Sequence, residues 1–285
     1  MIRFGTAGNP DNFYENGGKA SADMPAWLKT QGLSAYEYQC GKGVKISAET
    51  AEKLGKNARD NGIYLSVHSP YFISLSSVEE EKRLNSVNYI MQTLSAARAM
   101  GAKRIVVHAG SCSKISREQA MEYATDTLKI ALFEAKNAGL DDIALCPETM
   151  GKINQLGTVD EIIELCKISE SFIPCIDFGH VNARGLGCLS ETADFEEIIN
   201  KIHNQLGEER GKRFHVHFTR IEYTTGGEKK HIPYEDESFG PDFHPFAELI
   251  VKKNLEPVII CESPGTQGID AVTYKNIYEK TAERI

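Results

Sequence analysis

Residues 64–108, which decide the fold, read YLSVHSPYFISLSSVEEEKRLNSVNYIMQTLSAARAMGAKRIVVH. Two short apolar runs, Tyr64–His68 and Arg104–His108, stand at its ends, and each run finishes on a histidine. Between them, Val78–Met100 repeats apolar side chains at intervals of three and four, which indicates a helix with one buried face. Gly101 follows as the stop that ends such a helix. The stretch therefore predicts two parallel strands joined by a helical crossover.

The same unit recurs along the whole chain without a linker or a low-complexity segment. Repeated strand–helix units over 285 residues are typical of one (β/α)8 barrel. We therefore predict an α/β TIM barrel as a single domain over residues 1–285. Asn9–Gly32 and Ile221–Asp242 are expected to be mainly loops. The expected strands are Ile2–Thr6, Ala35–Gln39, Tyr64–His68, Arg104–His108, Asp142–Pro147, Phe172–Asp177, Arg213–Phe218 and Pro257–Glu262.

Composition narrows the function classes. The chain is 41% hydrophobic and 25% charged and has no apolar run long enough to cross a membrane, so we expect a soluble protein with no membrane partner. Its seven cysteines form no C-x-x-C pair, which is typical of free thiols in a reducing cytoplasm. The net charge of −8 provides no general basic surface for nucleic acid, although bound divalent cations reverse the sign of the field locally. Nothing indicates an obligate protein partner.

Histidines and carboxylates stand at or just past the ends of the expected strands. In a (β/α)8 barrel these ends meet at one mouth, so the side chains are expected to lie together there. One such histidine alone is more often an ordinary hydrogen-bonded residue. Burying the whole set without metal, however, would leave unpaired polar groups and repelling charges. The sequence therefore predicts a cluster of at least two metal ions held by His68, His108, Glu148, Asp177, His180, His215, His231 and Glu262.

Glu148 has expected ligands on both sides, so it is suited to bridging two cations. Two metal ions about 3.5–4 Å apart stabilise the transition state of phosphoryl transfer. The residues therefore favour metal-assisted hydrolysis of a phosphodiester, with Glu148 as the catalytic residue. Zn²⁺ is the expected cofactor, and Mn²⁺ or Fe²⁺ would suit the same ligands.

Six features of the chain belong together: HSPYFISL (68–75), HAGS (108–111), ETMG (148–151), CIDFGH (175–180), His215 and Glu262. They resemble endonuclease IV, the metal-dependent apurinic/apyrimidinic endonucleases of the xylose isomerase-like barrel superfamily. The resemblance implies a barrel that cleaves DNA on the 5′ side of abasic sites in base excision repair, with Tyr71 beside the DNA pocket. It implies three ions: the first on His68, His108 and Glu148; the second on Glu148, Asp177, His215 and Glu262; the third on His180, His231 and an aspartate two residues before His231.

The chain departs from that pattern at two places. Lys229 stands where the resemblance expects the aspartate, so we expect two firmly bound ions and a weak or absent third, unless Glu228 or Glu235 substitutes. We also expect the charge of Lys229 to lie near that site as a substrate contact. The loop at residues 39–43, QCGKG, differs from the polar loop with which the repair enzymes probe DNA.

Other interpretations stay open from the sequence. A sugar isomerase or epimerase of the same superfamily would hold one metal on Glu148, Asp177, His215 and Glu262, and the two glutamates would move protons beside a carbonyl. His68 and His108 would have no ligand role in it, which favours the nuclease interpretation. A barrel that binds metal without turnover is a third class. On the expected strands, His217 is a substrate contact, a support for a ligand or an ordinary barrel residue, and Glu37 orients a ligand histidine or forms a structural ion pair.

Overall fold

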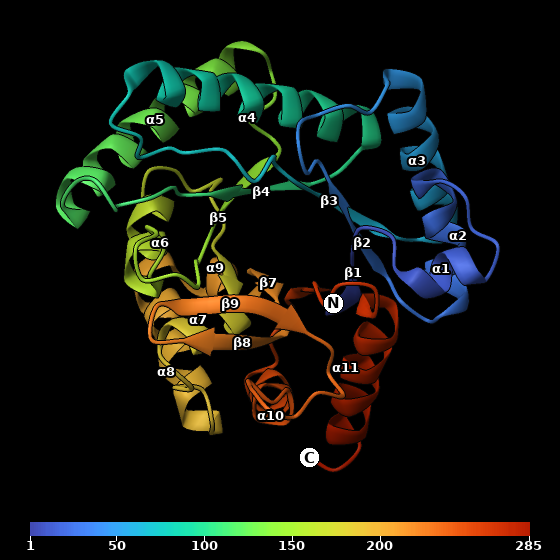
Figure 1. Ribbon diagram of the computed structural model, residues 1–285. Coiled ribbons are helices and arrows are strands. Elements are labelled where there is room, and N and C mark those ends of the chain that lie inside the picture. The colour runs from blue at the N-terminus through green and yellow to red at the C-terminus, as the bar shows by residue number, and fades with distance from the viewer.

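The barrel is closed by eight parallel strands in the order β1-β10-β7-β6-β5-β4-β3-β2. A computed structural model describes residues 1–285, and helices surround the strands on the outside (Figure 1). The prediction of a (β/α)8 barrel is confirmed. Its strands are β1 (Arg3–Ala7), β2 (Ala35–Gln39), β3 (Tyr64–His68), β4 (Arg104–His108), β5 (Ala144–Glu148), β6 (Cys175–Asp177), β7 (His215–His217) and β10 (Val258–Cys261).

Local chemistry explains where the helices begin and end. Ser47 accepts a hydrogen bond from the backbone N–H of Thr50 and so caps the first turn of α3, while Gly62 ends that helix with a φ of 71°. Thr158 and Glu161 form a capping box at the start of α6. The helices are α1 (Asp11–Glu15), η1 (Ser21–Asp23), α2 (Met24–Thr30), α3 (Ala48–Asn61), α4 (Glu80–Met100), α5 (Arg117–Asn137), α6 (Val159–Cys166), α7 (Phe178–Arg184), α8 (Thr192–Leu206), α9 (Glu208–Lys212), α10 (His244–Lys253) and α11 (Gln267–Ala282).

An aromatic cluster fixes the part of the barrel that follows β6 and β7. Phe178 and Phe218, which come directly after these strands, pack with Phe195, Phe243 and Phe246 at ring-centroid distances between 4.5 and 6.5 Å. All five side chains are buried. Removing one such ring costs about 3–5 kcal/mol. The carboxyl ends of both strands are therefore held firmly in place.

Two segments differ from their expected loop character. Residues 220–232 form an antiparallel hairpin of β8 (Arg220–Thr224) and β9 (Gly227–Ile232), which packs against α7 at the rim of the barrel. Asn9–Gly32 contains three short helices. The hairpin contains His231, one of the residues expected to bind metal. No helix is long and apolar enough to span a membrane.

Candidate metal centre

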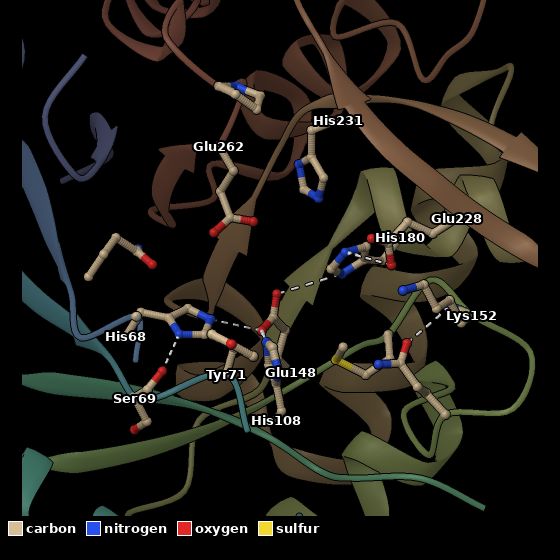
Figure 2. A pocket seen from close by; sticks show the side chains of 15 residues that line it. His68, Ser69, Tyr71, His108, Glu148, Lys152, His180, Glu228, His231 and Glu262 are labelled. Atoms are coloured by element: carbon tan, nitrogen blue, oxygen red, sulfur yellow. Dashed lines mark hydrogen bonds and ion pairs between the residues drawn. The ribbon is translucent and has the colours of Figure 1, made fainter. Parts of the chain in front are cut away.

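Five consecutive barrel strands end on a residue that can bind metal. The last residues of β3, β4, β5, β6 and β7 are His68, His108, Glu148, Asp177 and His217, and Glu262 follows β10 directly. In the strand register His108 lies opposite Glu148, and Asp177 lies opposite His217. A cavity of about 430 Å³ lies at the carboxyl-terminal mouth of the barrel, where TIM barrels place their active sites, and four of the six residues line it: His68, His108, Glu148 and Glu262 (Figure 2).

The first group of ligands is His68, His108 and Glu148. The Nε2 atoms of His68 and His108 lie 3.3 and 3.1 Å from the same oxygen, Glu148 Oε2. His68 Nδ1 donates a hydrogen bond to the carbonyl oxygen of Ser69 at 2.8 Å, which fixes the ring and directs Nε2 into the group. The structure therefore brings together the three residues expected for a first ion.

The second group consists of Glu148, Asp177, His217 and Glu262, whose ligand atoms lie within 4.8 Å of one another. His217 Nδ1 is 2.9 Å from Glu148 Oε1 and 3.3 Å from Glu262 Oε2. Glu148 thus turns Oε2 to the first group and Oε1 to the second. A carboxylate in this position can bridge two cations, which is the geometry that the sequence predicted for Glu148.

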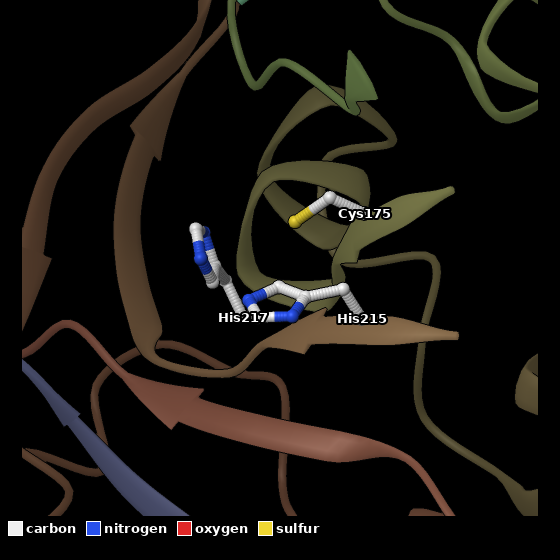
Figure 3. A group of neighbouring side chains, drawn as sticks. All are labelled: Cys175, His215 and His217. Atoms are coloured by element: carbon white, nitrogen blue, oxygen red, sulfur yellow. The ribbon is translucent and has the colours of Figure 1, made fainter. Parts of the chain in front are cut away.

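His215 does not join these groups, and the sequence-based assignment of this residue to the second ion is corrected. It lies two residues before the end of β7, deeper in the barrel and opposite Cys175 (Figure 3). Its Nε2 donates to Glu37 Oε2 at 2.9 Å. Burial lowers the pKa of His215 to about 4 despite that carboxylate, so the ring is neutral. His217 takes the expected place because it, and not His215, is the residue at which β7 ends.

Glu37 lies beneath the second group and supports it. This fully buried carboxylate accepts hydrogen bonds from His217 Nε2 at 3.0 Å, His215 Nε2 at 2.9 Å and Ser66 Oγ at 2.8 Å. Its bond to His217 directs Nδ1 of that ring into the metal group and raises its basicity, as carboxylates behind metal-binding histidines do. Both alternatives for Glu37, orientation of a ligand histidine and a structural ion pair, are compatible with these contacts.

Replacing Glu37 by glutamine should weaken metal binding at the second group. The substitution keeps the shape but removes the charge that orients His217, and such changes lower metal affinity by about 10–100-fold. Titration of the metal-free protein with Zn²⁺ against a competing chelator measures the effect. Ser66→Ala is the matched control, because it removes a hydrogen bond to the same carboxylate and leaves the charge. Equal affinities for the two variants would contradict the role given to Glu37.

A third group contains Asp177, His180 and His231, again with ligand atoms within 4.8 Å of one another. His180 Nδ1 donates to the carbonyl oxygen of Thr149 at 2.9 Å, and the rings of His180 and His231 meet edge to face. Lys229 does not contribute, contrary to expectation. Its Nζ pairs with Glu222 at 2.5 Å and its side chain is 55% exposed, so its charge lies on the outer face of the hairpin.

Carboxylates at the mouth raise the pKa of His68 and of His180. Burial lowers the pKa of His68, but the hydrogen bond and charge of Glu148 outweigh burial and raise it to about 9. Burial also lowers the pKa of His180, yet the charges of Asp177 and Glu228 raise it to about 9. The negative charge of the carboxylates is therefore balanced either by protons on the imidazoles or by metal ions in place of those protons.

The donor atoms present fit divalent cations. Asp177 Oδ2 and His231 Nδ1 are buried ligand atoms with no hydrogen-bond partner in the protein. Unsatisfied buried polar atoms are costly, and a cation bound between them would satisfy both. Tyr71 also borders the cavity, with a side chain that is 55% exposed, and its contact with a substrate stays a prediction. The backbone carbonyls of Ser69 and Thr149, which orient two histidines, left no signal in the sequence.

These features define a (β/α)8 barrel whose mouth gathers side chains that could bind metal from six strands and a hairpin. The chain belongs to the xylose isomerase-like TIM barrel family, whose model matches residues 25–284. An uncharacterized protein of Methanocaldococcus jannaschii is 34% identical over 280 residues, which cover 98% of each chain. A probable endonuclease 4 of Mycoplasma pneumoniae is 26% identical over 226 residues, which cover 77% of this chain and 73% of that one.

Solved structures share the fold at low sequence identity. A D-tagatose 3-epimerase-like protein has a TM-score of 0.73 and 20% identity, with 99% of this chain and 98% of that chain covered. Endonuclease IV from Thermus thermophilus has a TM-score of 0.69 and 19% identity, with 99% and 100% covered. An epimerase-like protein and an endonuclease thus share this fold, so the reaction has to be argued from the site.

Proposed function

We propose that this protein is a metal-dependent phosphodiester hydrolase that cleaves DNA at abasic sites. The observation that carries the proposal is the position of Glu148, whose two oxygens face two separate groups of ligands. The Nε2 atoms of His68 and His108 both face this carboxylate, and each is free to bind a metal ion in its place. A single-metal enzyme would not use them, whereas a two-metal hydrolase needs them for its first ion.

Divalent cations, with Zn²⁺ expected and Mn²⁺ or Fe²⁺ suited to the same donors, would supply Lewis acidity and activate water at neutral pH. The chain's own residues position them. Glu148 sets the spacing between the first and second groups, Glu37 orients His217, and Asp177 Oδ1 accepts the backbone N–H of His180 at 2.8 Å, which fixes α7 against the site.

Bound cations would explain how the mouth of an acidic protein could bind an anionic phosphodiester. Glu148, Asp177 and Glu262 meet at the mouth, and their field alone would repel a phosphate. Bound divalent cations reverse that field locally. Lys152 lines the same cavity and can add positive charge toward a phosphate, while the exposed ring of Tyr71 offers a face on which an unstacked nucleotide could stack.

One observation favours a second candidate, a single-metal sugar isomerase or epimerase. Glu148, Asp177, His217 and Glu262 already form a complete four-ligand group by themselves. Its two glutamates are placed so that each could move a proton at a carbon beside a carbonyl. This candidate leaves His68 and His108 without a function, and for that reason we rank it second.

The deciding experiment compares both activities in wild type and His108→Ala. We expect metal-replete wild type to cleave an abasic-site duplex, and His108→Ala to lose about 10²-fold or more of that activity because the first ion loses a ligand. His244→Ala is the matched control, since His244 is an exposed histidine on α10 that pairs only with Asp242. Sugar interconversion by wild type that survives in His108→Ala, with no DNA cleavage, would overturn the proposal.

A further inference from the structure

Strand β9 contains one residue more than the strand it pairs with. Tyr223 lies opposite Glu228, but Glu222 lies opposite Lys230, so Lys229 has no partner and forms a β-bulge. In a regular strand, residues 228 and 231 would point to opposite faces because side chains alternate. The extra residue cancels this difference, and Glu228 and His231 both line the cavity.

The outer face of the hairpin holds the bulge in place. Lys229 and Lys230 both turn away from the cavity and pair with the two oxygens of Glu222, at 2.5 and 3.4 Å. Two successive residues facing the same way is the local signature of the inserted position. Lys229 therefore acts through the backbone, by shifting the register, and not through its charge.

Glu228 reaches His180 from the hairpin. Its Oε2 lies 3.4 Å from His180 Nε2, and its side chain is 16% exposed (Figure 2). His180 Nδ1 already donates to the carbonyl of Thr149, so Nε2 is the ring atom that faces Glu228, and it carries a lone pair whenever the ring is neutral. A lone pair and a carboxylate oxygen repel at this distance unless a proton or a metal ion lies between them. His231 Nδ1, a buried atom without a partner, belongs to the same group.

The loop after β5 is shaped to admit this carboxylate. A Cβ at Gly151 would lie 2.6 Å from Glu228 Cβ, 2.9 Å from Glu228 Oε2 and 2.9 Å from His180 Cδ2, so only glycine leaves the space. Backbone hydrogen bonds tie the loop to the hairpin: Glu228 N donates to Gly151 O at 3.1 Å, and Ile153 N donates to Gly226 O at 3.2 Å. The position of Glu228 is thus set from two sides.

We infer that Glu228, delivered by the bulge at Lys229, joins His180 and His231 to hold a third divalent cation. The inference deepens the proposed function and rests on it only for the presence of metal at the mouth, not for the substrate. It replaces the expectation that the third ion is weak because residue 229 is not an aspartate. A carboxylate and two imidazoles form a ligand set that Zn²⁺ accepts, with a place left for water or substrate.

The test counts Zn²⁺ by equilibrium dialysis and follows Co²⁺ binding by its visible absorption, neither of which needs activity. Wild type should bind three ions, and Glu228→Gln should bind two, with the third step weakened by about 100-fold through loss of a charged ligand. Glu222→Gln is the control from the outer face of the same hairpin and should still bind three. Gly151→Ala provides a second route, because its methyl group displaces Glu228 and should lower third-site affinity without changing any ligand.

Lys229→Asp separates the inference from the resemblance-based expectation. If residue 229 occupied the ligand position, an aspartate there would strengthen the third site; we expect no gain, because this residue points outward. A stronger third site in Lys229→Asp, or three ions in Glu228→Gln, would overturn the inference. Two ions in both wild type and Glu228→Gln would overturn it and leave the two-metal proposal standing. Binding of one ion or none by wild type would instead remove the proposed function itself.

Discussion

Glu148→Gln should empty two metal groups at once and lower turnover by about 10³-fold or more. One residue serves both groups, since Oε2 faces His68 and His108 while Oε1 faces His217. The amide that replaces the carboxylate removes the negative charge that both ions share, and transition-state stabilisation by the ions disappears with them. Metal analysis of the purified variant, together with its rate on the substrate established for wild type, measures both effects.

Glu262→Gln is the control variant with which the metal loss of Glu148→Gln is compared. Glu262 contacts the second group only, through His217, so its loss should cost one ion and leave the first group loaded. Both variants are isosteric and neutral at the changed position, and thermal unfolding will show that each is folded. If Glu148→Gln lost no more metal than Glu262→Gln, Glu148 would not be a bridging ligand.

The site could be located from the sequence because one rule governs most of it. The carboxyl ends of the parallel strands of a barrel meet at one mouth, so a histidine or carboxylate at the end of each run predicts a shared site. His68, His108, Glu148 and Asp177 follow the rule and lie together at the mouth. The strands themselves were easy to recognise for the same reason, since Tyr64–His68 and Arg104–His108 have the predicted bounds.

The error at His215 arose where the end of a strand was misplaced. The run Arg213–Phe218 contains two histidines on one face, and alternation alone cannot say which of them lies at the mouth. The strand observed is only His215–His217, and its last residue is the one that meets Asp177 and Glu262. The rule of strand ends would have selected His217 if the strand's end had been known.

The error at Lys229 has a different physical cause. The resemblance places an acidic ligand two residues before His231, and a bulge shifts by one the residue that lies on the inner face of the strand. Whether a strand bulges depends on its pairing with a partner strand, here Tyr223 and Glu222 against Glu228 and Lys230, and single-sequence patterns contain no record of pairing. A segment that is expected to be a loop, moreover, has no strand alternation from which its inner face could be predicted.

His217→Gln should lose the second ion and about 10²–10³-fold of turnover, whereas His215→Gln should lose about 10-fold or less. The two histidines form a well-matched pair. Both are fully buried, and both donate to Glu37, at 3.0 and 2.9 Å, so the structural cost of replacing either one should be similar. They differ in the other ring nitrogen: Nδ1 of His217 faces Glu148 and Glu262, while Nδ1 of His215 has no partner and lies away from the cavity.

Metal content is the measurement that distinguishes them, because a purely structural role would lower the stability of both variants without selecting one ion. We expect His215→Gln to keep the full complement of metal and to bind the second ion somewhat less tightly, since Glu37 loses one of its donors and can shift beneath His217. His217→Gln removes a ligand atom outright, and no neighbouring nitrogen can replace it. Equal metal loss in the two variants, or greater loss in His215→Gln, would contradict this assignment and support His215 as a ligand of the second ion.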